Sequence, residues 1–435
     1  MGFTFTLLNH ITMYRIYILL FSSLLLLSAS CKEKKDSDRS SAQHQSLKIE
    51  SQFQSKQKDS LPPVETREPE ADFQPAFKNQ TRAPGMVTET PYQVEVLTSS
   101  LKSPWGIVAL DDNRFLITQN EGNMVIASED GELSKPITGI PEVDSRGQGG
   151  LLGLTLDNDF ENNQMVYWCF SEPSDKGNLT AVAKGKLNEE KNTFEKVEVI
   201  YRAIPVYDGK LHYGGRVVMD EKGNLFVSTG ERSDKVTRPQ AQELNSALGK
   251  ILYITTEGEP VKGNPFEGEK DALPEIWSYG HRNVQGLAFH PETGELWEAE
   301  FGPRGGDELN LIKPGKNYGW PVIGYGIEYS GEIIGEGITQ KEGMEQPVYY
   351  WDPVLSPSGI SFYAGDNIPE WENNLFLGGL NGNHIARVKL EDDKVVGEER
   401  LLEKEKQRFR DLTQGKDGNL YAVTDAGRLY KISPK

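Results

Sequence analysis

The sequence predicts an all-β protein, a six-bladed β-propeller of four-stranded antiparallel blades. A short strand pattern recurs six times after about residue 91, which is typical of a repeat architecture. The chain also has 44 Gly in 435 residues, and this abundance indicates many tight turns between short strands. No segment has a long apolar repeat of 3.6 residues, so we expect little helix beyond one short helix near residues 241–248.

The repeated pattern is a short apolar strand that mostly follows an acidic turn. Such turns include Asp220-Glu-Lys-Gly223 and Pro291-Glu-Thr-Gly294, and they are typical of hairpins. The copies lie roughly 45 to 80 residues apart, which is room for the four strands of one blade. They occupy residues 114–118, 164–168, 223–228, 294–298, 374–377 and 418–423. On the repeats alone, a β-sandwich or two β domains remain alternatives.

The first residues have the pattern of a targeting signal. We expect residues 1–30 to be a signal peptide, because the apolar run behind Arg15 is shorter than the ~20 residues that span a membrane. The segment Leu27-Ser-Ala-Ser-Cys31 resembles a bacterial lipobox, which predicts a lipid on Cys31. Such a lipid would anchor the protein to a membrane in the periplasm or cell envelope. The alternative is ordinary signal cleavage, with Cys31 incidental.

We expect residues 31–90 to form a flexible lipoprotein tether and residues 91–435 to form the propeller. The tether is rich in Lys, Glu, Ser, Gln and Asp and has no apolar period, so it cannot bury enough surface to offset the entropy of ordering.

The net charge of -18 excludes a typical nucleic-acid binder. Two cysteines exclude a disulfide framework, and Cys169 in an apolar run is expected to be a core residue.

One histidine stands out as a candidate general base. His212 lies in Leu211-His-Tyr-Gly-Gly-Arg216, just before a predicted strand, and imidazole titrates near neutral pH. Glu231 follows the second strand of the same predicted hairpin, so both residues should lie at one end. A carboxylate there could orient the imidazole. The alternatives are a packed histidine and an exposed turn acid.

Two further segments could bind charged ligands. The segment Glu300-Phe-Gly-Pro-Arg-Gly-Gly-Asp-Glu308 offers exposed carbonyls and carboxylates, the oxygen ligands that Ca²⁺ prefers, unless it is a plain Gly-rich turn. Arg408 and Arg410 fall on one strand face and could hold a polycarboxylate, unless they form a solvated basic patch. The sequence has no zinc spacing, no dinucleotide-binding glycine pattern and no nucleophile elbow.

Six motifs in order resemble the soluble, pyrroloquinoline quinone (PQQ)-dependent sugar dehydrogenases, and most closely the bacterial aldose sugar dehydrogenases. The resemblance extends from about residue 98 to residue 434, and the family fold is a six-bladed propeller, in agreement with the repeat count. The motifs are Gly147-Gln-Gly-Gly-Leu-Leu152, His212-Tyr-Gly-Gly-Arg216, Gly280-His-Arg-Asn-Val-Gln-Gly-Leu287, Gly302-Pro-Arg-Gly-Gly-Asp-Glu308, Asn317-Tyr-Gly-Trp-Pro321 and Arg408-Phe-Arg-Asp411.

The resemblance implies an enzyme that oxidises aldoses at C1 to lactones by hydride transfer to PQQ. It implies that His212 is the general base, that Glu231 orients it, and that Arg282 lies near the quinone oxygen. It also implies an active-site Ca²⁺ on Gly302 and Pro303, and a second, structural Ca²⁺ on Glu308 and Tyr318. The implied PQQ contacts are Gln148, Arg282, Asn283, Tyr329, Gly379, Leu380, Asn381, Arg408 and Arg410.

The sequence departs from the family pattern at two informative positions. Asn381 stands where the family has a PQQ-contacting Lys, which removes one cation from the cofactor site. Leu211 precedes the expected base where the glucose-specific branch has an acid, which weakens a glucose assignment. The sequence identifies neither the sugar nor the electron acceptor. A non-catalytic propeller that binds sugar or protein, and a Ca²⁺ lactonase, are the alternative functions.

Overall fold

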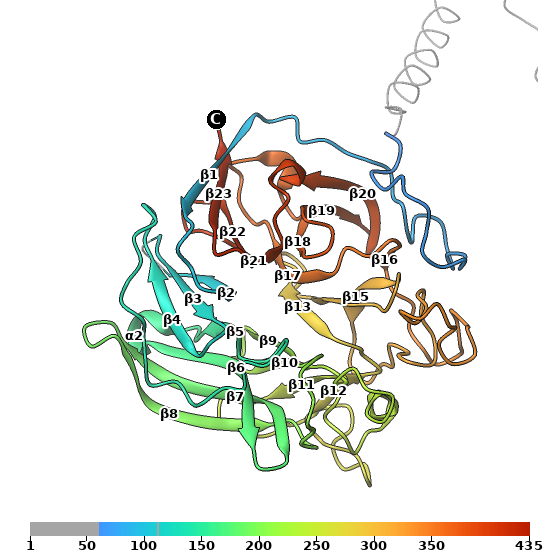
Figure 1. Ribbon diagram of the computed structural model, residues 1–435, viewed down its shortest axis with the longest axis horizontal. Coiled ribbons are helices and arrows are strands. Elements are labelled where there is room, and N and C mark those ends of the chain that lie inside the picture. Colours follow the sequence, from blue (N-terminus) through green and yellow to red (C-terminus); the bar gives the residue numbers. More distant parts are fainter. Residues whose placement is uncertain (1–60, 111–112) are drawn as a thin grey trace, which may run out of the picture. The chain divides into compact units, whose positions relative to one another are not determined.

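The computed structural model describes residues 61–110 and 113–435, and they form a six-bladed β-propeller (Figure 1). The signal peptide, Cys31 and the first half of the expected tether lie outside the described residues. Within the described ranges, no helix has the length and apolar character needed to cross a membrane. Cys169 is a free, fully buried thiol in the core, as expected.

Each blade is an antiparallel sheet whose first strand faces the central channel. Five sheets have four strands, and the first blade has three among the described residues. The first blade consists of β2 (Pro104–Ala109), β3 (Phe115–Gln119) and β4 (Asn123–Ala127), and the second of β5 (Leu151–Leu156), β6 (Met165–Ser174), β7 (Gly177–Asn188) and β8 (Thr193–Arg202). The third blade consists of β9 (Gly214–Met219), β10 (Leu225–Thr229), β11 (Lys250–Ile254) and β12 (Ile276–Tyr279), and the fourth of β13 (Val284–Phe289), β14 (Leu296–Glu300), β15 (Asp307–Ile312) and β16 (Tyr349–Trp351). The fifth blade consists of β17 (Pro357–Phe362), β18 (Leu375–Gly379), β19 (Ile385–Glu391) and β20 (Lys394–Leu401), and the sixth of β21 (Phe409–Gln414), β22 (Leu420–Thr424), β23 (Leu429–Pro434) and β1 (Tyr92–Thr98).

The six copies of the sequence pattern are the second strands of the six blades. They fall on β3, β6, β10, β14, β18 and β22. Five of these strands are buried at every residue, because both faces pack between neighbouring blades. Continuous burial explains why this strand carries the strongest apolar signal in each repeat.

The helical content is very small. The described helices are α2 (Phe160–Asn163) and three 3-10 turns, η1 (Arg238–Gln242), η2 (Pro369–Trp371) and η3 (Glu403–Glu405). The short helix expected near residues 241–248 is therefore only the turn η1. The Lys250 side chain donates to the carbonyls of Gln240, Ala241 and Leu248, so hydrogen bonds from a side chain hold this segment where a helix was expected.

The two ends of the propeller close the ring together. Strand β1 pairs antiparallel with β23, from Tyr92 opposite Pro434 to Thr98 opposite Leu429. The last blade therefore contains three strands from the C-terminus and one from the N-terminal side, which lie side by side in Figure 1. This pairing closes the ring with main-chain hydrogen bonds and does not depend on particular side chains.

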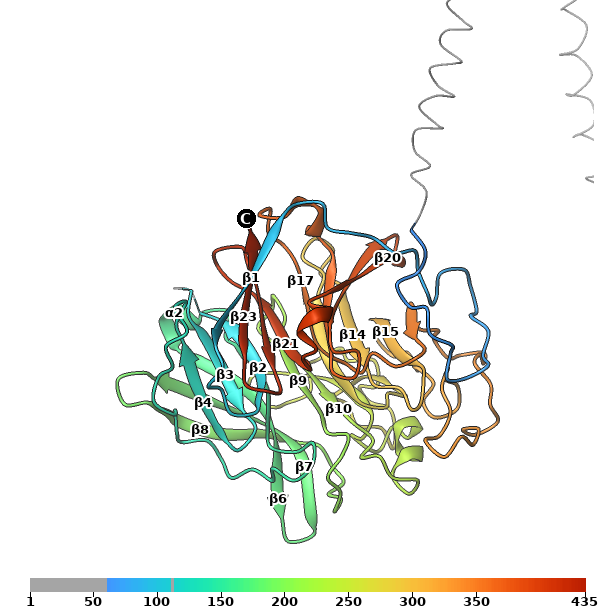
Figure 2. The same ribbon diagram turned by 45° about the horizontal axis from the view of Figure 1, so that its top comes forward.

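The expectation of a flexible tether over residues 31–90 is wrong for its second half. Residues 61–90, the N-terminal arm, run along the outer edges of the fourth and fifth blades (Figure 2). The Tyr350 N–H donates to the Gln80 carbonyl, the Met86 N–H donates to the Glu398 carbonyl, and the Glu398 N–H donates to the Pro84 carbonyl. Main-chain hydrogen bonds to the edge strands β16 and β20 hold the arm. Because such bonds do not require apolar side chains, the polar composition of the arm did not indicate that it packs on the propeller.

A buried ion pair crosses the central channel. Arg216 Nη1 lies 2.7 Å from Asp411 Oδ2, and Arg216 Nε donates to the Gln285 carbonyl at 2.9 Å. The same Asp411 oxygen accepts the Ile107 N–H at 2.9 Å, and the Arg216 guanidinium lies 4.6 Å from the Trp105 ring centroid. These contacts join the inner strands β2, β9, β13 and β21, which belong to four different blades.

We expect Arg216→Met to destabilise the protein by ~3–5 kcal/mol, because it leaves the Asp411 carboxylate buried and unpaired. The free energy of unfolding from urea titration measures this effect. The double variant Arg216→Met, Asp411→Leu should recover most of the loss, since it removes both charges. A single variant as stable as the parent protein would show that the pair does not hold the blades.

Candidate functional site

The candidate site lies at the end of the channel where the inner strands begin. Each second strand runs antiparallel to its inner strand and therefore ends on the same side. Residues of the first, second, fourth, fifth and sixth blades line a cavity of about 390 Å³ there, and the third blade lies beside it through the hydrogen bond from the His212 N–H to Gln148. The candidate residues that line it are Gln148, Leu380, Arg408 and Arg410, together with Phe301, Gln285 and Asp425.

The hairpin of β9 and β10 brings His212 and Glu231 together. His212 Nδ1 lies 2.6 Å from Glu231 Oε1, and both side chains are buried. The other Glu231 oxygen accepts the Ser233 N–H at 3.1 Å. The backbone N–H of His212 donates to Oε1 of Gln148, whose side chain lines the cavity, at 2.8 Å. His212 itself has a φ of 47°, a sparsely populated conformation that this hydrogen bonding supports.

The His212 imidazole is held neutral. Burial and the nearby Arg282 guanidinium lower its pKa to about 4, although the Glu231 carboxylate acts in the opposite direction. The carboxylate next to Nδ1 favours the tautomer with its proton on that nitrogen. Nε2, which has no hydrogen-bond partner in the described ranges, then carries a free lone pair. A neutral imidazole in this state can accept a proton.

A second pair of site residues is positioned by a buried carboxylate from β14. Glu300 Oε2 accepts the backbone N–H groups of Arg282 and Asn283, at 2.5 and 3.1 Å. Arg282 Nη1 donates to the carbonyls of Phe301 and Gly302, at 2.9 and 2.7 Å. Among the described residues, Arg282 Nε and Asn283 Nδ2 are buried donors with no partner. Such donors are rare in folded proteins and indicate a missing acceptor.

Two arginines of the last blade share one carboxylate. Arg408 Nε and Arg410 Nε each lie 2.8 Å from Asp425, on different oxygens. Arg408 also donates to the Leu380 carbonyl at 3.2 Å, and Arg410 to Gln285 Oε1 at 3.0 Å. The group therefore presents a net positive charge to the cavity. Sequence reasoning missed Asp425, although it follows its second strand as Glu231 follows β10.

The Gly-rich segment between β14 and β15 is a tight, buried loop. Asp307 Oδ1 accepts the Gly302 N–H at 2.8 Å, and its Oδ2 accepts the Ser356 N–H at 2.6 Å. A Cβ on Gly302 would lie 2.2 Å from the Gly306 carbonyl oxygen, so only glycine fits there. Burial raises the pKa of Asp307 to about 7. The loop presents the carbonyls of Phe301 and Gly302 to Arg282, and sequence reasoning missed the anchoring role of Asp307.

Behind this loop lies a cluster of buried acids. His281 Nδ1 lies 3.8 Å from Glu298 and 3.5 Å from Glu300, and Asn310 Nδ2 donates to Glu298 and Glu308 at 2.7 and 3.2 Å. Burial raises the pKa of Glu298 and of Glu308 well above the usual range. In the described part of the chain, His281 Nδ1, Glu298 Oε2 and Asn310 Oδ1 have no hydrogen-bond partner. Oxygen and imidazole donors of this kind can hold a divalent cation.

Of the expected site residues, four line this cavity (Gln148, Leu380, Arg408 and Arg410), and Arg282, Gly302, Pro303 and Glu308 line a cleft that shares Phe301 with it. Tyr329, Asn381, Gly379 and Tyr318 are among those that line neither. Tyr329 is 73% exposed and lies in the long segment between β15 and β16. Asn381 is exposed next to Leu380, whereas Gly379 is buried in β18. The Tyr318 hydroxyl donates to the Leu311 carbonyl at 2.6 Å, so only its backbone carbonyl is available to a cation.

The low pKa of His212 can be measured directly. We expect its imidazole to stay neutral down to about pH 5 and to titrate at about 4, as seen by NMR of the ring carbons. His384 also has a pKa lowered to about 4 by burial, so loss of one signal in His212→Asn would assign the resonance. Since the unfolded chain binds this proton near pH 6.5, the buried imidazole should reduce stability as the pH falls from 6.5 to about 4. A titration near 6.5 would contradict the described burial.

Comparisons with known proteins agree with this architecture. Residues 101–431 match the model of the glucose/sorbosone dehydrogenase family. The aldose sugar dehydrogenase YliI of Escherichia coli is 41% identical over 347 residues, 79% of this chain and 93% of the relative. Quinoprotein glucose dehydrogenase B of Acinetobacter calcoaceticus is 29% identical and covers 78% of this chain and 87% of its own length.

Solved structures show the same similarity. The soluble aldose sugar dehydrogenase of Escherichia coli, in its apo-form, superimposes with a TM-score of 0.76 at 40% identity, over 79% of this chain and 100% of that one. The PQQ-bound aldose sugar dehydrogenase of Streptomyces coelicolor superimposes with a TM-score of 0.65 at 30% identity, over 80% of this chain and 100% of that one. The match to the family model spans most of the propeller, and this chain therefore belongs to the glucose/sorbosone dehydrogenase family.

Proposed function

We propose that this protein is a PQQ- and Ca²⁺-dependent dehydrogenase that oxidises aldose sugars at C1 to lactones, with His212 as the general base. The observation that carries the proposal is the buried, neutral His212, whose Nδ1 is held by Glu231 beside a cavity with two arginines. The names of two relatives, a quinoprotein glucose dehydrogenase and a PQQ-bound aldose sugar dehydrogenase, support the cofactor.

The residues around the cavity fit PQQ, a planar tricarboxylate with an ortho-quinone. Arg408 and Arg410 offer guanidinium groups to carboxylates, which such groups bind in bidentate geometry. The unpartnered donors Arg282 Nε and Asn283 Nδ2 could be satisfied by the acceptor oxygens of the same ligand. When bound, PQQ with its Ca²⁺ supplies the acceptor for the hydride of sugar C1.

The chain's own residues then account for the proton. His212 Nε2 takes the proton of the C1 hydroxyl, and Glu231 stabilises the imidazolium that forms. Because the pKa of His212 is lowered to about 4, the base is available throughout the neutral range. Arg282 adds positive charge beside the reacting centre, which favours negative charge that develops there.

The Gly302–Asp307 loop fits an active-site Ca²⁺. The Gly302 carbonyl accepts one hydrogen bond from Arg282 and keeps a second lone pair, and the Pro303 carbonyl is the other expected ligand. The buried acid cluster fits the second, structural Ca²⁺, because its carboxylates lack a cationic partner of comparable charge. The expected ligands of this second Ca²⁺ are Glu308 and the backbone of Tyr318. The cluster adds three further candidate ligands, which are Glu298, Glu300 and Asn310.

We also propose that the protein is a lipoprotein, anchored through Cys31 in the periplasm or cell envelope. The lipobox-like segment and the preceding apolar run support this proposal. Activity across a panel of sugars and electron acceptors identifies the aldose and the acceptor.

Reconstitution tests the activity. Protein loaded with PQQ and Ca²⁺ should reduce an artificial dye when an aldose is added, and His212→Ala should lower kcat by ~10²–10⁴-fold. A spectral titration should show that His212→Ala still binds PQQ, because Arg408 and Arg410 are unchanged. PQQ bound tightly with no aldose oxidised would favour the non-catalytic sugar- or protein-binding propeller instead.

Calcium removal tests the second cation site. A cation present at about 100 times its Kd adds ~2.7 kcal/mol of stability, so chelation should lower the Tm of the protein. Glu298→Gln should remove most of this Ca²⁺ effect, whereas Glu292→Gln, an exposed control on the same hairpin, should retain it. A Tm independent of Ca²⁺ would contradict the site.

A further inference from the structure

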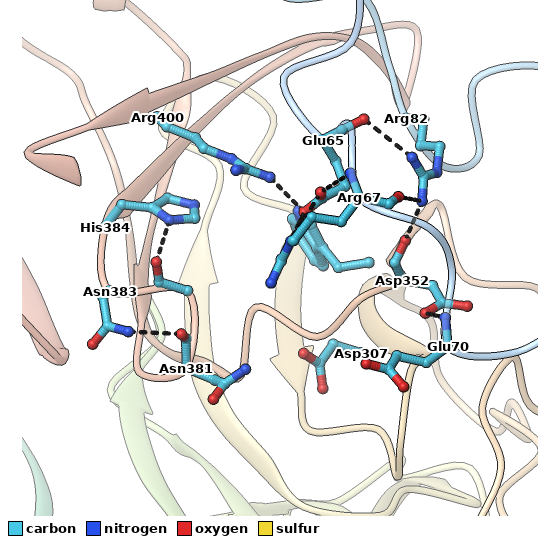
Figure 3. A network of polar contacts seen from close by, with 12 residues as sticks. Glu65, Arg67, Glu70, Arg82, Asp307, Asp352, Asn381, Asn383, His384 and Arg400 are labelled. Atoms are coloured by element: carbon cyan, nitrogen blue, oxygen red, sulfur yellow. Dashed lines mark hydrogen bonds and ion pairs between the residues drawn. The ribbon is translucent and has the colours of Figure 1, made fainter. Parts of the chain in front are cut away.

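The N-terminal arm reaches the loop that the proposed function assigns to Ca²⁺. The backbone N–H groups of Glu70 and Ala71 donate to the two carboxylate oxygens of Asp352, at 2.7 and 3.1 Å. Asp352 is only 6% exposed and lies just after β16 (Figure 3). One carboxylate therefore holds two consecutive amides of the arm.

The same carboxylate lies against the Gly302–Asp307 loop. A Cβ on Gly305 would lie 3.0 Å from Asp352 Oδ1, so the loop backbone packs closely on this side chain. The neighbouring Gly306 N–H donates to the Trp351 carbonyl at 3.0 Å. Arg304 of the loop also pairs with Glu70 of the arm, at 2.5 Å. Arm and loop thus share one buried anchor and one ion pair.

A second contact joins the arm to the segment that covers this loop. Phe73 borders a small apolar cavity with Trp320, Ile323 and Gly324. Those three residues also line a cleft with Arg282, Gly302 and Pro303. Phe73 therefore supports the back of a segment whose other side faces the candidate cofactor residues.

The arm is attached independently on either side of these contacts. Glu65 pairs with Arg400 of β20 at 2.7 Å, and Arg82 donates to the carbonyls of Glu65, Arg67 and Asp352 (Figure 3). Farther along, Thr90 binds both oxygens of Glu370 through its N–H and hydroxyl. Because both flanks are fixed, residues 70–73 can transmit a defined position to the loop.

We propose that the N-terminal arm is a clamp that holds the Gly302–Asp307 loop in its ligand-binding conformation, with Phe73 and Asp352 as positioning residues. The arm lies outside the residues 101–431 that match the family model. The clamp itself follows from the contacts above, whereas its effect on Ca²⁺ affinity rests on the proposed function.

Hydrogen exchange in full-length protein without PQQ or Ca²⁺ tests the clamp. Phe73→Ala and Asp352→Asn should speed amide exchange roughly tenfold in peptides covering residues 302–307 and 319–328, and leave the second blade unchanged. Phe77→Ala is a matched control, because Phe77 lies on the same arm and is exposed. Val87→Ala, at another exposed apolar side chain of the arm, is a second control. Exchange equal to that of the controls would overturn the proposal.

A Ca²⁺ titration tests the consequence for the site. With PQQ absorbance as the readout, the half-saturating Ca²⁺ concentration should rise about five- to tenfold in Phe73→Ala and stay unchanged in Phe77→Ala. The KM for sugar at saturating PQQ and Ca²⁺ should not change, since the clamp touches no substrate residue. Faster exchange with no PQQ binding, even in the parent protein, would retain the clamp and refute the proposed function. Faster exchange with unchanged Ca²⁺ affinity would overturn the link between clamp and site.

Discussion

The buried ion pair between Arg216 and Asp411 is the constraint on which the rest of the site depends. It joins inner strands of four blades at the centre of the ring. His212 lies just before β9, which contains Arg216, and Arg410 is the neighbour of Asp411. Gln285 accepts from Arg216 through its carbonyl and from Arg410 through its side chain. A buried ion pair contributes little net stability, but an arrangement of the inner strands that separates the two charges is strongly disfavoured. The pair therefore fixes His212 and the two arginines of the last blade relative to one another.

Charge is separated across the site. Arg408 and Arg410 line the cavity and Arg282 lines the neighbouring cleft, whereas Glu298 and Glu300 are buried and Glu308 is half-buried behind the Gly-rich loop. Burial and Arg282 lower the pKa of His212. The three arginines favour anionic ligands, whereas the buried acids favour a bound cation. The same separation explains how a protein with a net charge of -18 can present a positive cavity.

The N-terminal arm links the outer edge of the propeller to this site. Its hydrogen bonds cover the unpaired edges of β16 and β20, which would otherwise be open to other strands. Its contacts at Asp352 and Phe73 then reach the two segments that enclose the Gly-rich loop. Edge protection and loop support are thus performed by one stretch of chain with few apolar residues.

The sequence by itself determined the six blades, because each second strand is buried on both faces and so must be apolar at every repeat. It also indicated His212 with Glu231 and the Arg408–Arg410 pair, since hairpin geometry and strand alternation are local rules. Only the tertiary structure decided the shared carboxylate of Asp425, the acid cluster around Glu298, the exposure of Tyr329 and the packing of residues 61–90. These features depend on contacts between segments far apart in the chain and on main-chain hydrogen bonds, and neither leaves a periodic signal in the sequence.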